Sequence, residues 1–246
     1  MSAVLVIAGT DSSGGAGLTR DVATLSAFGM DALCAVSAVT AQSEREVAAV
    51  LLIPAALVRA QIETALGSGR VRAVKTGMLG ARDTVEALAA ALPPRERLPL
   101  VVDPVLAASS GGVLLDEAGR AALRTRLLPR ATLLTPNLPE AALLLGAAPA
   151  GSPGEIVAQG RALCALGAAA VLMKGGHATG ALATDWLVSA DGAVREFTGA
   201  RYAGGRRGTG CALASGVAAG LARGLELAVA CARAKEHVTA LLQAAA

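Results

Sequence analysis

Aromatic residues make up only 2% of this 246-residue chain, although 54% of it is hydrophobic. A core must therefore be built from alanine, leucine and valine, and the chain has few rings on which nucleic-acid bases could stack. Charge of one sign is also scarce, because the formal net charge is +3. The only local basic excess is Arg201, Arg206 and Arg207, so no nucleic-acid-binding face is expected.

Long apolar runs and paired cysteines are absent as well. The longest charge-free apolar run, 208–222, is shorter than the ~18 residues that a membrane span requires. The start MSAVLVIAGTDSSGG has neither the basic residues nor the apolar length of a signal peptide. We therefore expect a soluble cytoplasmic protein with no membrane partner. The cysteines show no metal-ligand spacing, so buried reduced thiols are expected at Cys34, Cys164, Cys211 and Cys231.

Short apolar runs alternate with amphipathic helical patterns along the chain. This alternation predicts an α/β fold, a mostly parallel sheet with helices on both faces, in one domain spanning 1–246. Asp191-Gly192 lies between two apolar runs and predicts a β-hairpin, and two helices are expected to follow from about 209 and 226. The expected strands are 3–9, 32–41, 71–77, 98–103, 131–137 and 168–176, and the expected helices between them include 54–67, 81–92, 116–128 and 154–167.

Polar motifs follow the predicted strands at the point where each strand ends. In open α/β sheets, ligands bind beyond the carboxyl ends of the strands, so these motifs predict a site at one edge of the sheet. They read GTDSSGGAG, TAQS, KTGM, VDPV, TPNLPE and KGGH in chain order.

The glycine-rich segment 8–21 enters a predicted helix. Its glycines let backbone amides approach a ligand closely, or they form only a tight turn. The spacing matches neither the dinucleotide-binding pattern nor a Walker A loop. Asp21, inside the helix that follows, is either a solvated first-turn acid or a residue that faces the site.

Four further polar residues lie at strand ends or at a helix start. Asn137 and Glu140 lie three apart at a helix start, where they suit a Mg²⁺ ion that keeps several waters, or form a capping box. Asp103 ends a buried strand, where an unpaired carboxylate is costly. Lys174 ends another strand and either contacts phosphate or leaves for solvent.

The segment RRGTGC precedes a helix predicted to begin near Thr209. The amides of Gly208, Thr209, Gly210 and Cys211 would then form an anion pocket at the positive end of that helix. The same field should lower the Cys211 thiol pKa below its usual ~8.5 and make the sulfur a usable base. The alternative is a packing motif, because CALASGVAAG allows close contact between helices.

Taken together, AGTDSSGGAG, TAQS, KTGML, VVDPV, TPNLPEA, VLMKGGH and RGTGCALASG resemble, in order and spacing, the hydroxymethylpyrimidine and hydroxymethylpyrimidine phosphate kinases of thiamine biosynthesis. These belong to the ribokinase-like superfamily, and the resemblance spans about 3–240. It implies a three-layer α/β/α sandwich, ATP and Mg²⁺ as cofactors, and a homodimer.

The resemblance also implies individual roles. Gln42 would hydrogen-bond the aminopyrimidine edge, with Gly9, Asp21 and Met78 around the substrate. The other residues are expected to contact the phosphates or the metal ion. Asn137 and Glu140 would organise Mg²⁺ through water, Lys174 and Asp103 would lie by the phosphates, and GTGC at 208–211 would be the anion hole, with Cys211 as the base.

Two positions depart from the family's usual pattern. Arg207 stands where a histidine usually precedes GTGC, and the loop 201–207 is slightly shortened. The family commonly continues TAQNT.G after the glutamine, whereas this chain has TAQSEREV at 40–47, which alters the flap around Ser43–Glu46.

We therefore expect ATP-dependent phosphorylation of hydroxymethylpyrimidine and of its monophosphate. A pyridoxal kinase is the nearest alternative, because it shares the fold, the anion hole and the metal motif. A regulator that binds the pyrimidine without transferring phosphate is the alternative from another class.

Overall fold

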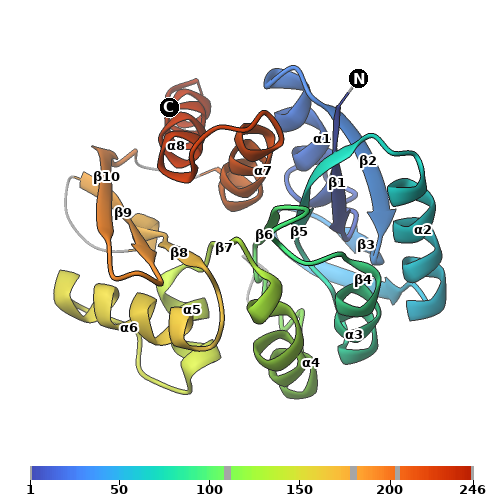
Figure 1. The fold of residues 1–246 in the computed structure, drawn as a ribbon, viewed down its shortest axis with the longest axis horizontal. Coiled ribbons are helices and arrows are strands. Elements are labelled where there is room, and N and C mark those ends of the chain that lie inside the picture. Colours follow the sequence, from blue (N-terminus) through green and yellow to red (C-terminus); the bar gives the residue numbers. More distant parts are fainter. Residues whose placement is uncertain (1, 108–111, 178–181, 203–205, 245–246) are drawn as a thin grey trace.

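The computed structural model describes residues 2–107, 112–177, 182–202 and 206–244. An eight-stranded sheet lies at its centre, in the order β10-β9-β8-β7-β6-β5-β1-β2, and β3 and β4 form a separate pair (Figure 1). The strands are β1 (Ala3–Ala8), β2 (Asp31–Val36), β3 (Ala38–Gln42), β4 (Val47–Leu52), β5 (Val71–Thr76), β6 (Leu100–Val102), β7 (Leu133–Leu134), β8 (Ala170–Met173), β9 (Leu182–Ser189) and β10 (Val194–Ala200).

The sheet is parallel from β2 to β8 and antiparallel only where β8, β9 and β10 pair. Side chains along a strand point alternately to opposite faces. In β1, Val4 and Val6 accordingly join one core cluster, whereas Leu5 and Ile7 join the other. The strand is buried on both sides, as expected of a parallel sheet between two helical layers.

The helices divide between the two faces of the sheet (Figure 1). One layer contains α1 (Gly17–Ala27), α7 (Thr209–Ala222) and α8 (Leu227–Gln243). The other contains α2 (Ala55–Gly67), α3 (Arg82–Ala91), α4 (Glu117–Ala122), α5 (Leu138–Leu145) and α6 (Pro153–Ala165). The predicted three-layer α/β/α sandwich is confirmed. No helix in the described ranges is long and apolar enough to cross a membrane.

The packing interpretation of the 208–224 segment is also correct for one face of α7. A Cβ placed on Gly216 would lie 3.0 Å from the Ala234 Cβ, and one on Gly220 would lie 2.7 Å from the Ala230 Cβ. Because α8 approaches α7 this closely, glycine is needed at Gly220 for the contact to form.

The predicted strand 32–41 is divided in two at Ser37. Ser37 is fully buried, and all its polar groups are bonded: its N–H donates to Ala8 O, its O accepts from Ile53 N–H, and its Oγ donates to Met78 O. The chain leaves the main sheet after this residue and pairs with β4. The sequence reading missed β4, because its residues are apolar yet largely exposed and show no alternation.

The predicted helix 116–128 changes its winding partway. Regular α-helix ends at Ala122, and a π-helical turn, η1 (Leu123–Leu127), and a 3-10 turn, η2 (Leu128–Arg130), continue it. The hairpin predicted at Asp191-Gly192 is confirmed, with β9 and β10 pairing on either side of it. The helices predicted from about 209 and 226 begin at Thr209 and Leu227.

A buried charge pair joins the middle of the sheet to two helices. Lys75 Nζ, on β5, donates to both Asp21 carboxylate oxygens at 2.8 Å, and Ser215 Oγ, on α7, donates to Asp21 Oδ1 at 2.8 Å. All three residues are 0% exposed. Burial is the largest single influence and acts to lower the pKa of Lys75, but the charges of Asp21, Cys211 and Asp103 and the hydrogen bonds to Asp21 together outweigh it and raise that pKa, so the ammonium stays charged.

Asp21→Asn should cost about 3–5 kcal/mol of unfolding free energy, because it leaves a buried ammonium without its counter-charge. Urea denaturation measures this. Glu63→Gln, in the exposed Arg59–Glu63 pair, is the control and should cost less than about 1 kcal/mol. Replacing both partners, as Asp21→Leu with Lys75→Met, should recover part of the loss. A loss in Asp21→Asn no larger than that in Glu63→Gln would contradict the assignment.

Candidate active site

The glycine-rich loop after β1 packs directly against the start of α7. Gly208, the N-cap of α7, has φ +78°, and a Cβ on it would lie 2.2 Å from Gly15 O. Gly17 has φ +58°, and a Cβ on it would lie 2.5 Å from Gly9 O. Both positions therefore require glycine for conformation and for space. The loop forms a tight turn that also lines one wall of a candidate anion site.

The start of α7 presents unpaired backbone amides, as the sequence predicts. The helix begins at Thr209, and its first i→i−4 bond runs from Ala212 N–H to Gly208 O. The amides of Thr209, Gly210 and Cys211 consequently have no acceptor within the helix. Such amides and the positive end of the helix dipole favour an anion at this point.

The Cys211 thiol lies between the buried pair and this helix start. Burial is the largest influence and raises the pKa of Cys211 to about 11, although the charge of Lys75 and an N–H from Gly17 favour the thiolate. The expectation of a lowered pKa is therefore wrong for the free protein. The helix dipole does favour the anion, but loss of solvent around the sulfur outweighs it.

Lys174 enters the site rather than solvent. Its Nζ donates to Asp103 Oδ1 at 3.0 Å and lies 3.8 Å from Glu140 Oε2, and its side chain is only 14% exposed. A Cβ placed on Gly210 would lie 3.2 Å from that Nζ and 3.8 Å from Asp103 Oδ2. The ammonium, the carboxylates and the start of α7 thus surround one small volume.

Asn137 and Glu140 form the capping box that the sequence analysis left open. Asn137 N–H donates to Glu140 Oε2 and Glu140 N–H donates to Asn137 Oδ1, both at 2.8 Å. Lys174 N–H donates to Pro136 O, which brings this helix start beside the end of β8. The Glu140 carboxylate therefore has two contacts: it caps the start of α5, and it also faces Lys174.

The carboxylates of Asp103 and Glu140 suit a Mg²⁺ ion that arrives with nucleotide phosphates. The described residues contain no cluster of three or more histidine, cysteine or acidic side chains, so the protein could supply only a few ligands. Mg²⁺ usually keeps several waters and takes one or two carboxylates with substrate phosphates. Glu140 also accepts backbone N–H bonds from Asn137 and Leu106, which favours contact through water.

The residues predicted around the substrate divide into two groups. Met78 Sδ would lie 3.1 Å from a Cβ on Gly9, so these two residues meet beside β3. Gln42 ends β3, and its backbone exchanges hydrogen bonds with Ser12 Oγ at 2.8 Å. Asp21, by contrast, has no exposed surface. It is therefore not a solvated acid, and its carboxylate is bonded to Lys75 and Ser215.

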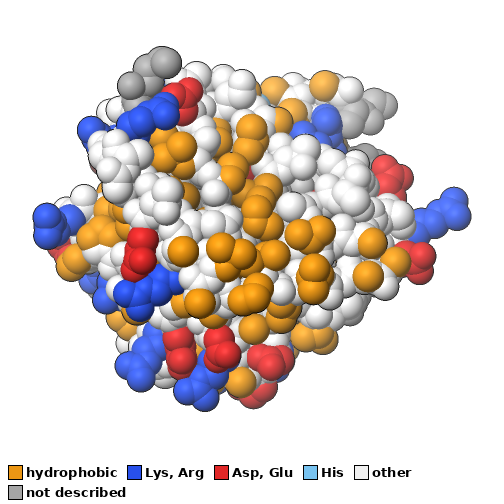
Figure 2. All heavy atoms as spheres, turned by 90° about the vertical axis from the view of Figure 1, so that its right-hand side faces the viewer, with side chains coloured by type: hydrophobic (Ala, Val, Ile, Leu, Met, Phe, Trp, Pro, Cys, Tyr) orange, Lys and Arg blue, Asp and Glu red, His pale blue; other side chains and the backbone are white. Residues whose placement is uncertain are grey.

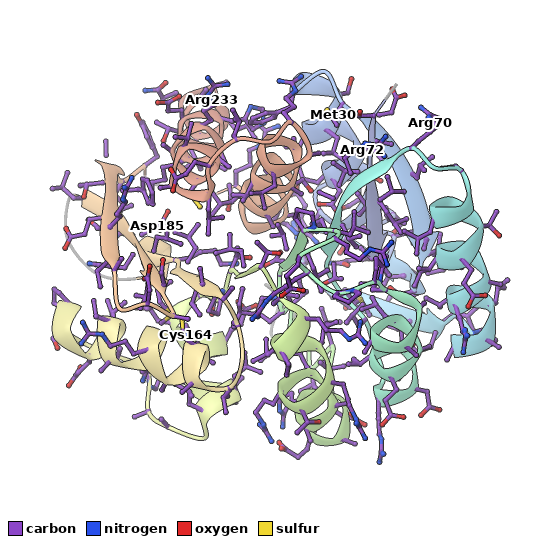
Figure 3. All side chains as sticks on the ribbon, in the orientation of Figure 1. Met30, Arg70, Arg72, Cys164, Asp185 and Arg233 are labelled. Carbon is purple, nitrogen blue, oxygen red and sulfur yellow. The ribbon has the colours of Figure 1, made fainter. Side chains whose placement is uncertain are left out.

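The turn after Lys174 is fixed from several sides. Gly175 N–H donates to Asp185 Oδ1 at 2.9 Å, and Lys235 Nζ donates to Asp185 Oδ2 at 2.7 Å (Asp185 is labelled on β9 in Figure 3). A Cβ on Gly175 would lie 1.8 Å from Thr184 O and 2.9 Å from the Trp186 ring. No side chain fits there, so the backbone that carries Lys174 is held rigidly in place.

Sequence reasoning missed Lys75, Asp11 and Asp185. Asp11 is 5% exposed, accepts from Ser13 and pairs with Arg207 at 3.1 Å. Lys75 and Asp185 are charged residues next to apolar neighbours in buried parts of their strands, which is a usable signal, because a buried charge must find a partner. Asp11 lies in the glycine-rich segment 8–21, in which the sequence analysis considered the glycines and Asp21 but not this residue.

The start of α7 faces Lys174, Asp103 and Glu140 at the carboxyl ends of the strands, inside a three-layer α/β/α sandwich. This combination of fold and site is that of a ribokinase-like kinase. Comparison with known proteins narrows this class. The family model "Phosphomethylpyrimidine kinase" matches residues 11–246, and the chain belongs to that family.

Individual relatives agree with this assignment. The hydroxymethylpyrimidine/phosphomethylpyrimidine kinase of Rhizobium meliloti (strain 1021) is 44% identical over 241 residues, covering 98% of this chain and 90% of the relative. The crystal structure of phosphomethylpyrimidine kinase from Clostridium difficile 630 superposes with a TM-score of 0.85 at 33% identity, covering 98% and 99% of the two chains. Pyridoxal kinase from Staphylococcus aureus in complex with AMP-PCP gives 0.88 at 29% identity, covering 98% and 88%.

Proposed function

We propose that this protein transfers the γ-phosphoryl group of ATP to the hydroxymethyl oxygen of 4-amino-5-hydroxymethyl-2-methylpyrimidine, and then to the phosphate of the monophosphate, in thiamine biosynthesis. The observation that carries the proposal is that Lys174 and Asp103 both lie against the first turn of α7. A Cβ placed on Gly210 there would be 3.2 Å from Lys174 Nζ and 3.8 Å from Asp103 Oδ2. Phosphoryl transfer depends mainly on positioning and on neutralising charge, which these groups supply.

The amides of Thr209, Gly210 and Cys211 stabilise the negative charge on the transferred group. Lys174 contacts the phosphates from the opposite side, and Asn137 helps to hold the nucleotide. Asp103 and Glu140 would hold Mg²⁺ through water, and the bound ion would supply positive charge that neutralises the phosphates. The fixed turn at Gly175 keeps the ammonium in place, so little reorganisation accompanies transfer.

Gln42, Gly9 and Met78 form the substrate side. The amide of Gln42 pairs with the aminopyrimidine edge, and Met78 supplies an apolar surface against the ring. A pyridoxal kinase is the second candidate, supported by the close superposition with the Staphylococcus aureus enzyme. The glutamine and methionine favour the pyrimidine.

An assay of ADP release with purified protein tests the function. We expect turnover with hydroxymethylpyrimidine and with its monophosphate, slower turnover with pyridoxal, and loss of activity when Mg²⁺ is removed by chelation. Preference for pyridoxal would favour the second candidate. Tight binding of the pyrimidine without ADP release would indicate the regulator instead.

Cys211 accepts the hydroxyl proton in the first reaction, whereas the second reaction has an anionic acceptor and requires no base. Cys211→Ala should therefore slow the first phosphorylation by about 10²-fold or more and the second by less than about threefold. Because the thiol pKa is raised to about 11, the thiolate fraction rises about tenfold per pH unit near neutrality. The first reaction should accelerate between pH 7 and 9 in the wild type only. Equal losses in both reactions would contradict the role of a base.

We also propose that the protein is a homodimer, with the outer face of the β3–β4 hairpin in the interface. This face carries exposed apolar residues, and Figure 2 shows apolar side chains gathered on that side of the molecule. On the outer face these are Val39 and its cross-strand partner Leu51, whereas Val50 and Leu52, also partly exposed, point to the other face with Thr40 and Ala38. Apolar patches of this kind mark association surfaces.

Leu51, 66% exposed, is the residue to substitute. Leu51→Glu should convert a dimer of the wild-type protein to a monomer, as measured by light scattering after size-exclusion chromatography. Val229→Glu, at an exposed position in the first turn of α8, is the control and should leave the mass unchanged. A monomeric wild type, or a dimer that persists in Leu51→Glu, would contradict the proposed interface.

A further inference from the structure

Arg207 links three segments that are distant in the sequence. Its Nη1 donates to Ser43 O at 2.8 Å and to Ser13 Oγ at 3.1 Å, and its Nη2 donates to Asp11 Oδ2 at 3.1 Å. Ser43 follows β3, Asp11 and Ser13 belong to the loop after β1, and Arg207 directly precedes the N-cap of α7. The guanidinium therefore bridges the hairpin, the glycine-rich loop and the candidate anion site.

Arg207 and the segment that begins at Ser43 are thus in contact, although they lie 164 positions apart. An arginine has five donors in a planar fork, so it can reach three acceptors at once, whereas an imidazole has two nitrogens and a lysine ammonium lacks the fork. The bridge requires this residue type.

The ion pair with Asp11 is the shielded part of the bridge, whereas the bonds to Ser13 and Ser43 are exposed. The Arg207 side chain is 19% exposed and the Asp11 side chain 3%. Asp11 Oδ1 also accepts from Ser13 N–H at 2.9 Å and from Ser13 Oγ at 2.7 Å, which fixes the loop that holds the arginine. Charge-assisted bonds in such a site are stronger than exposed ones.

The hairpin end that Arg207 holds is a compact turn. Ser43 N–H donates to Glu46 O at 2.9 Å, and Ser43 Oγ accepts from the N–H groups of Arg45 and Glu46 at 3.2 Å. The adjacent Gln42 backbone is bonded to Ser12 Oγ. Any displacement of the turn therefore moves Gln42. An isolated two-stranded pair is only marginally stable, so its position depends on such anchors.

We propose that Arg207 is a positioning residue that holds the β3–β4 hairpin against the glycine-rich loop and thereby sets the position of Gln42 at the substrate. The bridge itself follows from the contacts above, whereas its effect on pyrimidine binding rests on the proposed function. Arg207 acts through the hairpin and has no role in the phosphoryl transfer step.

Hydrogen exchange measured by mass spectrometry on the ligand-free protein tests the bridge without any assay of activity. Arg207→Ala should accelerate exchange in peptides covering 38–47 and leave those covering α6 unchanged. Arg206→Ala removes the same charge one residue earlier, where Nη1 donates to Leu241 O at 3.1 Å, and should match the wild type. Unchanged exchange in Arg207→Ala, or equal acceleration in both variants, would overturn the proposal.

Steady-state kinetics tests the consequence for the substrate. Arg207→Ala should raise KM for hydroxymethylpyrimidine about tenfold, with kcat and KM for ATP within about twofold of the wild type, because charge-assisted bonds to the hairpin are lost. Arg207→Lys should recover less than half of this effect. Full recovery by lysine, or a loss confined to kcat, would overturn the positioning role. If the wild type phosphorylates no pyrimidine, the proposed function fails, and hydrogen exchange still decides whether the bridge exists.

Discussion

The ion pair between Lys75 and Asp21 fixes the parts of the molecule on which the site depends. It lies where β5, α1 and α7 meet, with Ser215 bonded to the same carboxylate. A buried ammonium must keep its counter-charge, so these three elements cannot shift apart without exposing or orphaning a charge. The start of α7 is consequently held against the glycine-rich loop, where Gly208 contacts Gly15.

Opposite charges are also paired nearer the surface, in the candidate site. Above the buried pair lies the Cys211 thiol, and beyond it the Lys174 ammonium lies between Asp103 and Glu140. Each charge has an opposite neighbour, so the groups are held in place before any phosphate arrives. Under the proposed function, an entering phosphate would bind the Lys174 ammonium and the amides at the start of α7, which already lie beside each other.

Much of the architecture could be predicted from the sequence, because strand and helix periodicity is a local property. The parallel sheet, the hairpin at Asp191-Gly192 and the start of α7 were all predicted from short segments. The predictions that were wrong concern features that depend on residues distant in the sequence or on exposure to solvent. Ser37 divides one apolar run because it bonds to Ala8, Ile53 and Met78, and β4 shows no alternation because the residues on both of its faces are apolar.

The same distinction applies to the site. Lys174, Asp103, Asn137 and Glu140 follow strand ends, so topology brings them together as expected. The partner of Lys75 lies 54 positions away, and no local pattern identifies it. The pKa of Cys211 was misjudged for a related reason, because the helix start can be read from the sequence but the loss of solvent around the sulfur cannot.

The rigid turn at Gly175 has an optical consequence. Trp186 is the single tryptophan of the chain, and its ring borders the space where a Gly175 Cβ would lie. It is 7% exposed and lies on β9, next to Asp185, which holds that turn. Its intrinsic fluorescence therefore comes from one location, beside the backbone turn that follows Lys174. The chain therefore carries its own label-free reporter of the turn after Lys174, without competing signal from a second indole.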